Sequence, residues 1–207
     1  MEAVLDEPEP PARFATVVLH PHPLFGGTMH SHATYRLARA ARRAGGVALR
    51  FNFRGVGLSA GTHDRGEGES EDARIALDWL GGRHPELPVL SSGFSFGAWV
   101  AARVGCTEPR VAGLLLAGVA SRTFALGFLG DCRKPVAGIQ AEDDEFGDPE
   151  SVRRLLDGPP DRRRLAVVPG ATHLFAEDLD ALEREAGAAY GWLLQVLPSR
   201  RPEGGLA

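Results

Sequence analysis

The chain has 207 residues, of which 43% are hydrophobic and 24% are charged, and its formal net charge is −4. These values are ordinary for a globular protein, and the length suits one domain with a sizeable core. A weakly acidic chain has no excess of positive charge that would attract nucleic acid. No apolar run approaches the length needed to span a bilayer. We therefore expect no nucleic acid and no membrane among its partners.

Patterns typical of strands and of helices alternate along the chain. Short apolar runs predict strands at 14–20, 47–53, 88–92, 111–118, 135–140 and 165–168. Helical patterns lie between and after them, at 28–44, 69–80, 96–104, 151–156 and 179–193. The second helical pattern has apolar residues at i, i+3, i+4 and i+7, namely Ala73, Ala76, Leu77 and Leu80.

About six strands that alternate with helices are the signature of a mostly parallel sheet. Strands that are covered on both faces are apolar throughout, as these are, so helices should lie on both sides of the sheet. The sequence therefore predicts an α/β fold, a three-layer α/β/α sandwich. We expect one domain over 13–197, a flexible lead-in over 1–12 and a flexible tail over 198–207.

The N-terminus and the cysteines bear on the cellular compartment. Residues 1–11 are acidic and proline-rich, unlike a signal peptide, so a cytoplasmic location is the default expectation. Cys106 and Cys132 are the two cysteines, a number that fits a reduced compartment. We expect them to be small buried hydrophobic side chains rather than a disulfide.

The pentapeptide 93–97 is the most informative segment, because it reads G-F-S-F-G and matches the nucleophile-elbow pattern G-x-S-x-G. In this pattern a serine sits on a sharp turn between a strand and a helix, and the flanking patterns supply both. Glycine is needed on either side because the serine backbone is strained and the strand and helix approach closely. Ser95 is therefore predicted to be a catalytic nucleophile, and the protein a hydrolase or an acyl transferase.

A serine hydroxyl needs a histidine to take its proton and a carboxylate to orient that histidine. His173 is the candidate base, because it is the one histidine C-terminal to Ser95 and follows the last predicted strand and a tight turn. The candidate acids stand in the run 142–145, after the fifth predicted strand. The order serine, acid, histidine is typical of one fold class of serine hydrolases. Residue types alone leave both Asp143 and Asp144 open.

The tetrahedral intermediate of acyl transfer needs two backbone N–H groups that donate to its oxyanion. One is expected from Phe96, directly after the nucleophile. The other is expected from the loop after the first strand, residues 20–27, which reads H-P-H-P-L-F-G-G. The two prolines of this loop have no N–H to donate. Leu24 is our choice for the second donor, and His22 is the alternative.

Several motifs in this order resemble those of the α/β-hydrolase superfamily, over roughly residues 14–196. More narrowly, the chain resembles small bacterial hydrolases whose first loop reads H-P-H-P-x-x-G-G-T, which are relatives of the dienelactone-hydrolase and feruloyl-esterase-like branches. The matching residues are His20-Pro21-His22-Pro23 with Gly26-Gly27-Thr28, the segment 50–59, the elbow at 93–97, Asp144, and Pro169-Gly170-Ala171-Thr172-His173.

The resemblance implies a particular acid and a particular oxyanion donor. In the family an aspartate stands three residues after a glycine at the strand end, and Ala141 holds that glycine position here, so Asp144 matches. In related esterases the equivalent of residues 22–24 reads H-G-F and its third residue supplies the N–H, which favours Leu24. Dienelactone hydrolases proper have cysteine in place of Ser95, so their lactone chemistry is not implied.

The family's lid usually lies before the strand of the acid, and here that interval, 119–134, is too short for a substantial helical cap. The resemblance therefore implies a minimal α/β-hydrolase fold without a large lid, and an open active site. Four phenylalanines are candidates either to line this site or to pack in the core: Phe124, Phe128, Phe146 and Phe175.

Two motifs suggest other functions and are disfavoured. Residues 55–60 match the dinucleotide-binding pattern G-x-G-x-x-G/A, but no helical pattern opens there and the next strand does not end in an acidic residue. The pairs His20-x-His22 and His30-x-His32 resemble metal ligands, but they lack an accompanying cysteine or acidic cluster. We expect a bend at the first motif, a loop-shaping role for the second, and no metal or organic cofactor.

The sequence as a whole predicts a carboxylesterase, a serine hydrolase that cleaves small-molecule esters through an acyl-enzyme on Ser95, His173 and Asp144. A thioesterase or peptidase on the same residues is the first alternative. A non-catalytic binding protein on a hydrolase scaffold is the second, and it is disfavoured because all three residue types are present. The sequence leaves monomer and homodimer undecided.

Overall fold

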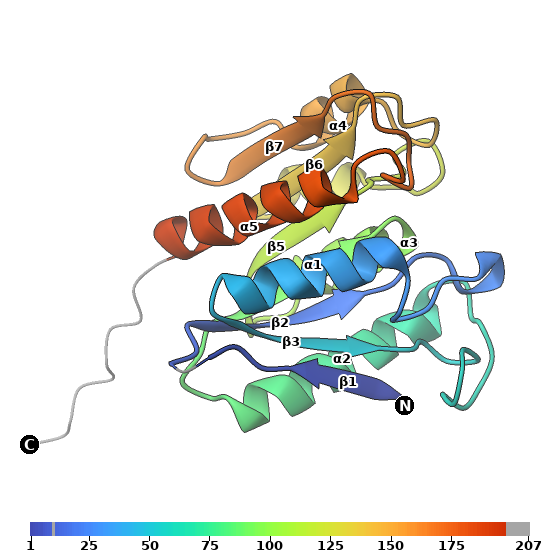
Figure 1. Cartoon of the computed structure of the whole chain (residues 1–207), viewed down its shortest axis with the longest axis vertical. Helices are drawn as coiled ribbons and strands as arrows, with labels where there is room; N and C mark the ends of the chain where they lie inside the picture. The colour runs from blue at the N-terminus through green and yellow to red at the C-terminus, as the bar shows by residue number, and fades with distance from the viewer. Residues whose placement is uncertain (10, 198–207) are drawn as a thin grey trace, which may run out of the picture.

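The computed structural model describes residues 1–9 and 11–197 of the chain (Figure 1). They contain one seven-stranded sheet in the order β1-β3-β2-β4-β5-β6-β7, in which all neighbouring strands are parallel except β1 and β3. The strands are β1 (Ala3–Asp6), β2 (Phe14–Leu19), β3 (Gly46–Phe51), β4 (Val89–Phe94), β5 (Val111–Ala117), β6 (Val136–Ala141) and β7 (Arg163–Val168). The helices are α1 (His32–Arg43), α2 (Glu67–Arg83), α3 (Phe96–Gly105), α4 (Pro149–Leu155) and α5 (Leu179–Val196), with two 3₁₀ helices, η1 (Pro23–Phe25) and η2 (Gly127–Asp131).

The helices form a layer on each face of the sheet. Helices α1 and α5 lie side by side on one face, where Figure 1 shows them in front of the strands. Helices α2, α3 and α4 pack on the opposite face. The prediction of a three-layer α/β/α sandwich with a mostly parallel sheet is therefore confirmed.

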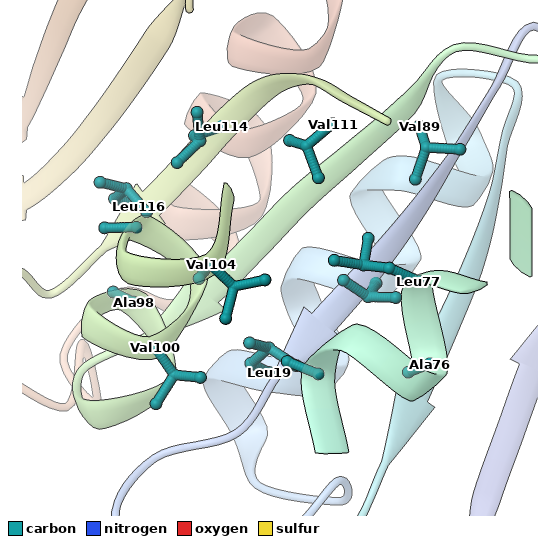
Figure 2. Packing of buried hydrophobic residues seen from close by; sticks show 14 of the residues in the cluster. Leu19, Ala76, Leu77, Val89, Ala98, Val100, Val104, Val111, Leu114 and Leu116 are labelled. Carbon is teal, nitrogen blue, oxygen red and sulfur yellow. The ribbon is translucent and has the colours of Figure 1, made fainter. Parts of the chain in front are cut away.

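Side chains that alternate along the central strands fill the space on both sides of the sheet. Val17 and Leu19 of β2 pack toward α2 and α3, whereas Val18 packs toward α1 and α5. Figure 2 shows the first side, where Leu19 lies near Leu77 of α2 and Val100 of α3. Burying a side chain of this size contributes about 1.5–3 kcal/mol, so the two apolar layers hold the strand ends in fixed positions.

The first strand is a feature that the sequence patterns did not reveal. Ala3–Asp6 lies within the predicted flexible lead-in, yet it pairs antiparallel with β3. The Arg50 Nε group of β3 also donates to Asp6 Oδ2 at 2.8 Å. The prediction was wrong here because a short edge strand is stabilised by its partner rather than by a pattern of its own. The predicted flexible tail, 198–207, lies outside the described residues.

The two cysteines also differ from the prediction. Cys106, at the C-terminal end of α3, and Cys132, directly after η2, form a disulfide. Their Cα atoms are 5.3 Å apart although 26 positions separate them in the sequence. The expectation of two unpaired thiols is therefore wrong, because spacing in the sequence does not show that the end of α3 packs beside the connection between β5 and β6.

The connections after β2 and β3 shape the end of the sheet that carries the site. Helix α1 begins later than predicted, because Thr28 and Ser31 form a turn in which the Thr28 N–H donates to Ser31 Oγ at 3.0 Å. After β3, Gly55 and Gly57 have φ angles of 75° and 55° in a bend, and the chain runs on to α2 without a helix. A dinucleotide fingerprint requires a helix at that point. Within residues 1–9 and 11–197, no helix is both long and apolar enough to cross a membrane.

Candidate active site

Ser95 occupies the sharp turn between β4 and α3. Its φ and ψ angles are 56° and −117°, a conformation that costs a residue other than glycine about 1–3 kcal/mol. A Cβ atom at Gly93 would lie 2.2 Å from the Gly97 carbonyl oxygen, and one at Gly97 would lie 2.3 Å from that of Leu19. Only glycine fits these two positions, so the predicted nucleophile-elbow geometry is present.

His173 lies beside Ser95, although 78 positions separate them in the sequence. Its Nε2 atom is 2.9 Å from Ser95 Oγ, and its Nδ1 atom is 2.8 Å from Asp144 Oδ2. Because a carboxylate can only accept, Nδ1 carries the proton and Nε2 is left to accept from the serine hydroxyl. The structure therefore brings together the predicted nucleophile, base and acid in one hydrogen-bonded chain.

The choice between the two candidate acids follows from their surroundings. Asp144 is buried and accepts hydrogen bonds from the Phe146 N–H at 2.9 Å and from Gln140 Nε2 at 2.7 Å. Asp143, its neighbour, is exposed to solvent. A buried carboxylate with fixed donors holds one orientation, and so Asp144 can orient His173 where Asp143 cannot.

Gln140 is a site residue that sequence reasoning missed. It is a buried side chain on β6 whose Oε1 accepts from the Val119 N–H at 2.8 Å and whose Nε2 also donates to the Gly147 carbonyl at 2.6 Å. These contacts tie the acid loop to the connection that follows β5. A polar residue in an otherwise apolar, fully buried strand was the signal that could have revealed it.

The predicted oxyanion donors differ in their availability. Within the described residues, no group accepts from the backbone N–H of Phe96, the first residue of α3, or from that of His22. The Leu24 N–H, in contrast, donates to His22 Nδ1 at 3.2 Å, and 69% of Leu24 is exposed. His22 also lines the cavity beside Ser95, whereas Leu24 does not. The structure therefore favours His22, our alternative, over Leu24.

A cavity of about 800 Å³ opens beside Ser95 and His173. Its walls are mostly aromatic and aliphatic side chains, among them Phe25, Phe94, Phe124, Phe146, Leu174 and Leu179. The connection between β5 and β6 contains only the short helix η2, so this connection places no helical cap over the opening. The predicted fold without a large lid is confirmed.

Two of the four candidate phenylalanines reach the cavity, and Phe124, one of these two, also packs against the core. Phe124 and Phe146 line the cavity, and the Phe146 ring lies 4.7 Å from the His173 ring between centroids. Phe175 is fully buried on the side of α1 and α5, and Phe128 packs against the opposite core. Phe124 and Phe146 are therefore the candidates for substrate contact.

A second histidine–carboxylate pair lies behind the loop that contains His22. His63 Nδ1 is 2.8 Å from Oε1 of the fully buried Glu69, and the His63 ring lies 4.9 Å from the His22 ring. Burial acts to raise the pKa of the Glu69 carboxyl, but donation from the Asp64 and Gly66 N–H groups brings that pKa below its usual value. Glu69 is therefore ionised and holds His63 in place. Sequence patterns did not reveal this pair.

The side chains of His20 and His22, the first of the motifs that resembled a metal site, form hydrogen bonds within their own loop. His20 is buried, its Nε2 accepts from the Phe53 N–H at 3.1 Å, and its Nδ1 donates to the Pro21 carbonyl at 2.6 Å. Burial lowers the pKa of His20 to about 4, so its ring is neutral. Among the residues that the structure describes, no group of three or more His, Cys, Asp or Glu side chains could hold a metal ion.

Known proteins with similar sequences and structures were found in two of three comparisons. No family model matches the chain. An uncharacterised protein of Rickettsia prowazekii is 34% identical over 168 residues, which span 77% of this chain and 71% of that protein. An alpha-beta serine hydrolase homologue from Coxiella burnetii is 31% identical, with a TM-score of 0.81, over 90% of this chain and 89% of that chain. A serine hydrolase without a lid from Xanthomonas campestris is also 31% identical, with a TM-score of 0.81, over 96% and 90%.

The fold and the position of Ser95 are those of an α/β hydrolase with a serine at the nucleophile position. With about a third of its residues identical to such proteins over most of their length, the chain belongs to the α/β-hydrolase superfamily. Within that superfamily it is similar to serine hydrolases that have no lid.

Proposed function

We propose that this protein is a serine esterase that hydrolyses carboxylic esters of small molecules, with Ser95, His173 and Asp144 as its catalytic triad. The observation that supports this function is their hydrogen-bonded chain, 2.9 Å from serine to histidine and 2.8 Å from histidine to aspartate, on the wall of an apolar cavity. The serine hydrolases among the similar proteins support the same class of reaction.

In the acylation half-reaction, His173 Nε2 takes the proton from Ser95 Oγ as that oxygen attacks the ester carbonyl carbon. The carbonyl oxygen becomes an oxyanion, which accepts hydrogen bonds from the backbone N–H groups of Phe96 and His22. Asp144 stabilises the imidazolium that forms on His173. The bond to the alcohol oxygen then breaks, the histidine gives its proton to that oxygen, and the acyl group remains on Ser95.

In the deacylation half-reaction, a water molecule takes the place of the alcohol. His173 accepts its proton while the water oxygen attacks the acyl carbon, and the same two N–H groups hold the second oxyanion. Collapse of this intermediate returns the proton to Ser95 and releases the acid. The cycle consists of two nucleophilic attacks on the acyl carbon with proton transfers through His173, and the proposal calls for no metal or organic cofactor.

Esters are favoured over amides because an open cavity offers little binding energy to offset a poorer leaving group. A thioesterase or a peptidase on the same triad is the alternative within the serine hydrolases. A binding protein that has lost catalysis would leave the triad without turnover.

The test is hydrolysis of p-nitrophenyl esters of graded acyl length by the wild type and by Ser95→Ala. We expect the variant to lose about 10³-fold or more in kcat, because removal of the nucleophile removes the acyl-enzyme route. Ser121→Ala is a matched control, since Ser121 lies outside the cavity lining and should keep wild-type turnover. An unchanged circular dichroism spectrum would show that both variants are folded.

Retained turnover in Ser95→Ala would reject the nucleophile assignment. Absence of turnover in the wild type, for esters, thioesters and amides alike, would favour the binding protein. The acyl length with the highest kcat/KM would indicate how long an acyl chain the cavity accommodates.

A further inference from the structure

The lining of the cavity beside Ser95 includes one carboxylate side chain. Among the described residues that line it, Glu145 is the single Asp, Glu, Lys or Arg. Burial and the neighbouring His63 lower the pKa of His22, so this lining ring is neutral near pH 7. A substrate therefore meets the carboxylate of Glu145 and, from the described part of the chain, no lysine or arginine.

Glu145 and His173 are neighbours in the cavity wall, and the leaving alcohol must come close to His173. The alcohol oxygen has to come within hydrogen-bond reach of His173 Nε2, because that atom returns the proton to it. Glu145 Oε2 accepts from the backbone N–H of His173 at 3.4 Å, and the adjacent Phe146 ring lies against the His173 ring. The oxyanion, in contrast, is directed toward Phe96 and His22.

The carboxylate of Glu145 has no hydrogen bond with Arg122, its neighbouring cation. Arg122 is close to it, but its Nη1 group donates to the Glu145 backbone carbonyl at 3.0 Å and its Nη2 group to Asp148 Oδ2 at 3.1 Å. Within the described residues, no lysine, arginine or histidine forms an ion pair with the Glu145 carboxylate. This carboxylate is therefore available to a ligand in the cavity.

We propose that the alcohol portion of the substrate is apolar and either uncharged or cationic, and that Glu145 sets this charge preference. This inference rests on the proposed esterase function. A cation near Glu145 gains Coulomb attraction, and the neighbouring Phe146 ring adds the attraction of an aromatic face for a cation. An anionic group in the same position is repelled and finds no lysine or arginine among the described lining residues.

The charge preference bears on the thioesterase alternative. A thioester whose thiol portion carries phosphate groups would place several negative charges on the side of Glu145. Such substrates are usually held by lysine and arginine side chains, which the described lining of the cavity lacks. The cavity therefore favours neutral or cationic oxygen esters over anionic thioesters.

The test compares two butyrate esters of equal shape, 3-tert-butylphenyl butyrate, which is neutral, and 3-(trimethylammonio)phenyl butyrate, which is cationic. The ratio of kcat/KM for the cationic ester to that for the neutral ester is measured in wild type, Glu145→Gln and Glu145→Lys. Any difference in intrinsic reactivity between the esters cancels when the ratios of the variants are compared. Glu145→Gln keeps the side-chain length and an oxygen that accepts from the His173 N–H.

We expect the ratio to fall about 2- to 5-fold in Glu145→Gln, the range for a partly exposed charge pair, and further in Glu145→Lys. Added salt should reduce the difference between wild type and variants. Asp143→Asn is the matched control, because it removes an exposed charge from the same loop outside the cavity lining, and its ratio should equal that of wild type.

A ratio that is the same in wild type, Glu145→Gln and Glu145→Lys would overturn the inference. An equal fall in Asp143→Asn would also overturn it, because the effect would then come from the general charge of the loop. Failure of the proposed esterase function has a different signature, namely no Ser95-dependent turnover of the neutral ester.

Discussion

Two histidine–carboxylate pairs of nearly equal geometry lie within the part of the chain that the structure describes. His173 Nδ1 is 2.8 Å from Asp144, and His63 Nδ1 is 2.8 Å from Glu69, and both carboxylates are buried. In the first pair the other ring nitrogen lies 2.9 Å from Ser95 Oγ at a cavity wall. In the second pair, the ring forms no hydrogen bond with a hydroxyl or thiol of the described residues.

The origin of each pair explains this difference. Asp144 and His173 follow the neighbouring parallel strands β6 and β7, whose carboxyl ends meet at the same edge of the sheet as the end of β4. His63 belongs to the connection between β3 and α2, and Glu69 caps the first turn of α2. A histidine–carboxylate pair thus becomes a base only where the fold places a nucleophile on its far side.

The largest expected effect is on the acid of the first pair. Asp144→Asn should lower kcat about 10²- to 10⁴-fold, because an amide no longer holds the Nδ1–H tautomer or stabilises the imidazolium. Asp143→Asn should leave kcat near the wild-type value, because this side chain is exposed. The measurement is ester hydrolysis by both variants side by side. A larger loss of kcat in Asp143→Asn than in Asp144→Asn would assign Asp143 as the acid.

His20 has no carboxylate in hydrogen-bond contact, and its protonation should make the free energy of unfolding depend on pH. Burial lowers the pKa of His20 from 6.5 to about 4 in the folded chain. Above pH 6.5 both the folded and the unfolded forms are neutral at this residue, and its full stabilising contribution is present. Between pH 6.5 and 4 only the unfolded chain takes up the proton, so the contribution is lost as the pH falls, about 3 kcal/mol in all.

This loss is measured by urea unfolding of wild type and His20→Asn between pH 7.5 and 4. Asparagine offers an acceptor for the Phe53 N–H but does not titrate in this range, so the free energy of unfolding of the variant should fall less steeply. Carboxylates titrate in both proteins and cancel in the comparison. Parallel pH profiles for the two proteins would contradict the assignment of a neutral buried His20.

The smallest expected effect is on the second pair, and it concerns stability rather than chemistry. Glu69→Gln leaves one of the three donors around this side chain without an acceptor and should lower the free energy of unfolding by about 1–3 kcal/mol. The melting temperature should fall by about 2–4 °C for each kcal/mol. Below that temperature kcat should stay close to wild type. A loss of kcat as large as in Asp144→Asn would show that the second pair takes part in catalysis.

Much of the fold could be predicted because its signals are local and repeated. Six apolar runs separated by helical patterns indicated a parallel sheet covered on both faces. Strand β1 was not predicted, because its four residues at the edge of the sheet carry no pattern of their own. The disulfide was not predicted for a related reason. Its two cysteines lie in segments that meet only after α3 and the β5–β6 connection have packed.

Some residues of the candidate site could be predicted from the sequence around them, whereas others depend on contacts with distant segments of the chain. Ser95 and its flanking glycines were readable because the elbow's backbone strain and close contacts arise within a few residues of sequence. His173 was readable because chain order and position after a strand are properties of the sequence. Gln140 and Glu69 were not, because a buried polar residue is recognisable only once its partners are known.

By itself the sequence determined the class of the fold and predicted the nucleophile and the histidine, since each of these depends on local backbone geometry or on chain order. The tertiary structure decided which side chains and N–H groups face the cavity. It buries Asp144 and leaves Asp143 in solvent, and it commits the Leu24 N–H to His22 Nδ1 while the His22 N–H stays open. It also places Glu145 beside His173. These choices depend on directions and distances between residues far apart in the chain, which residue types and spacing do not encode.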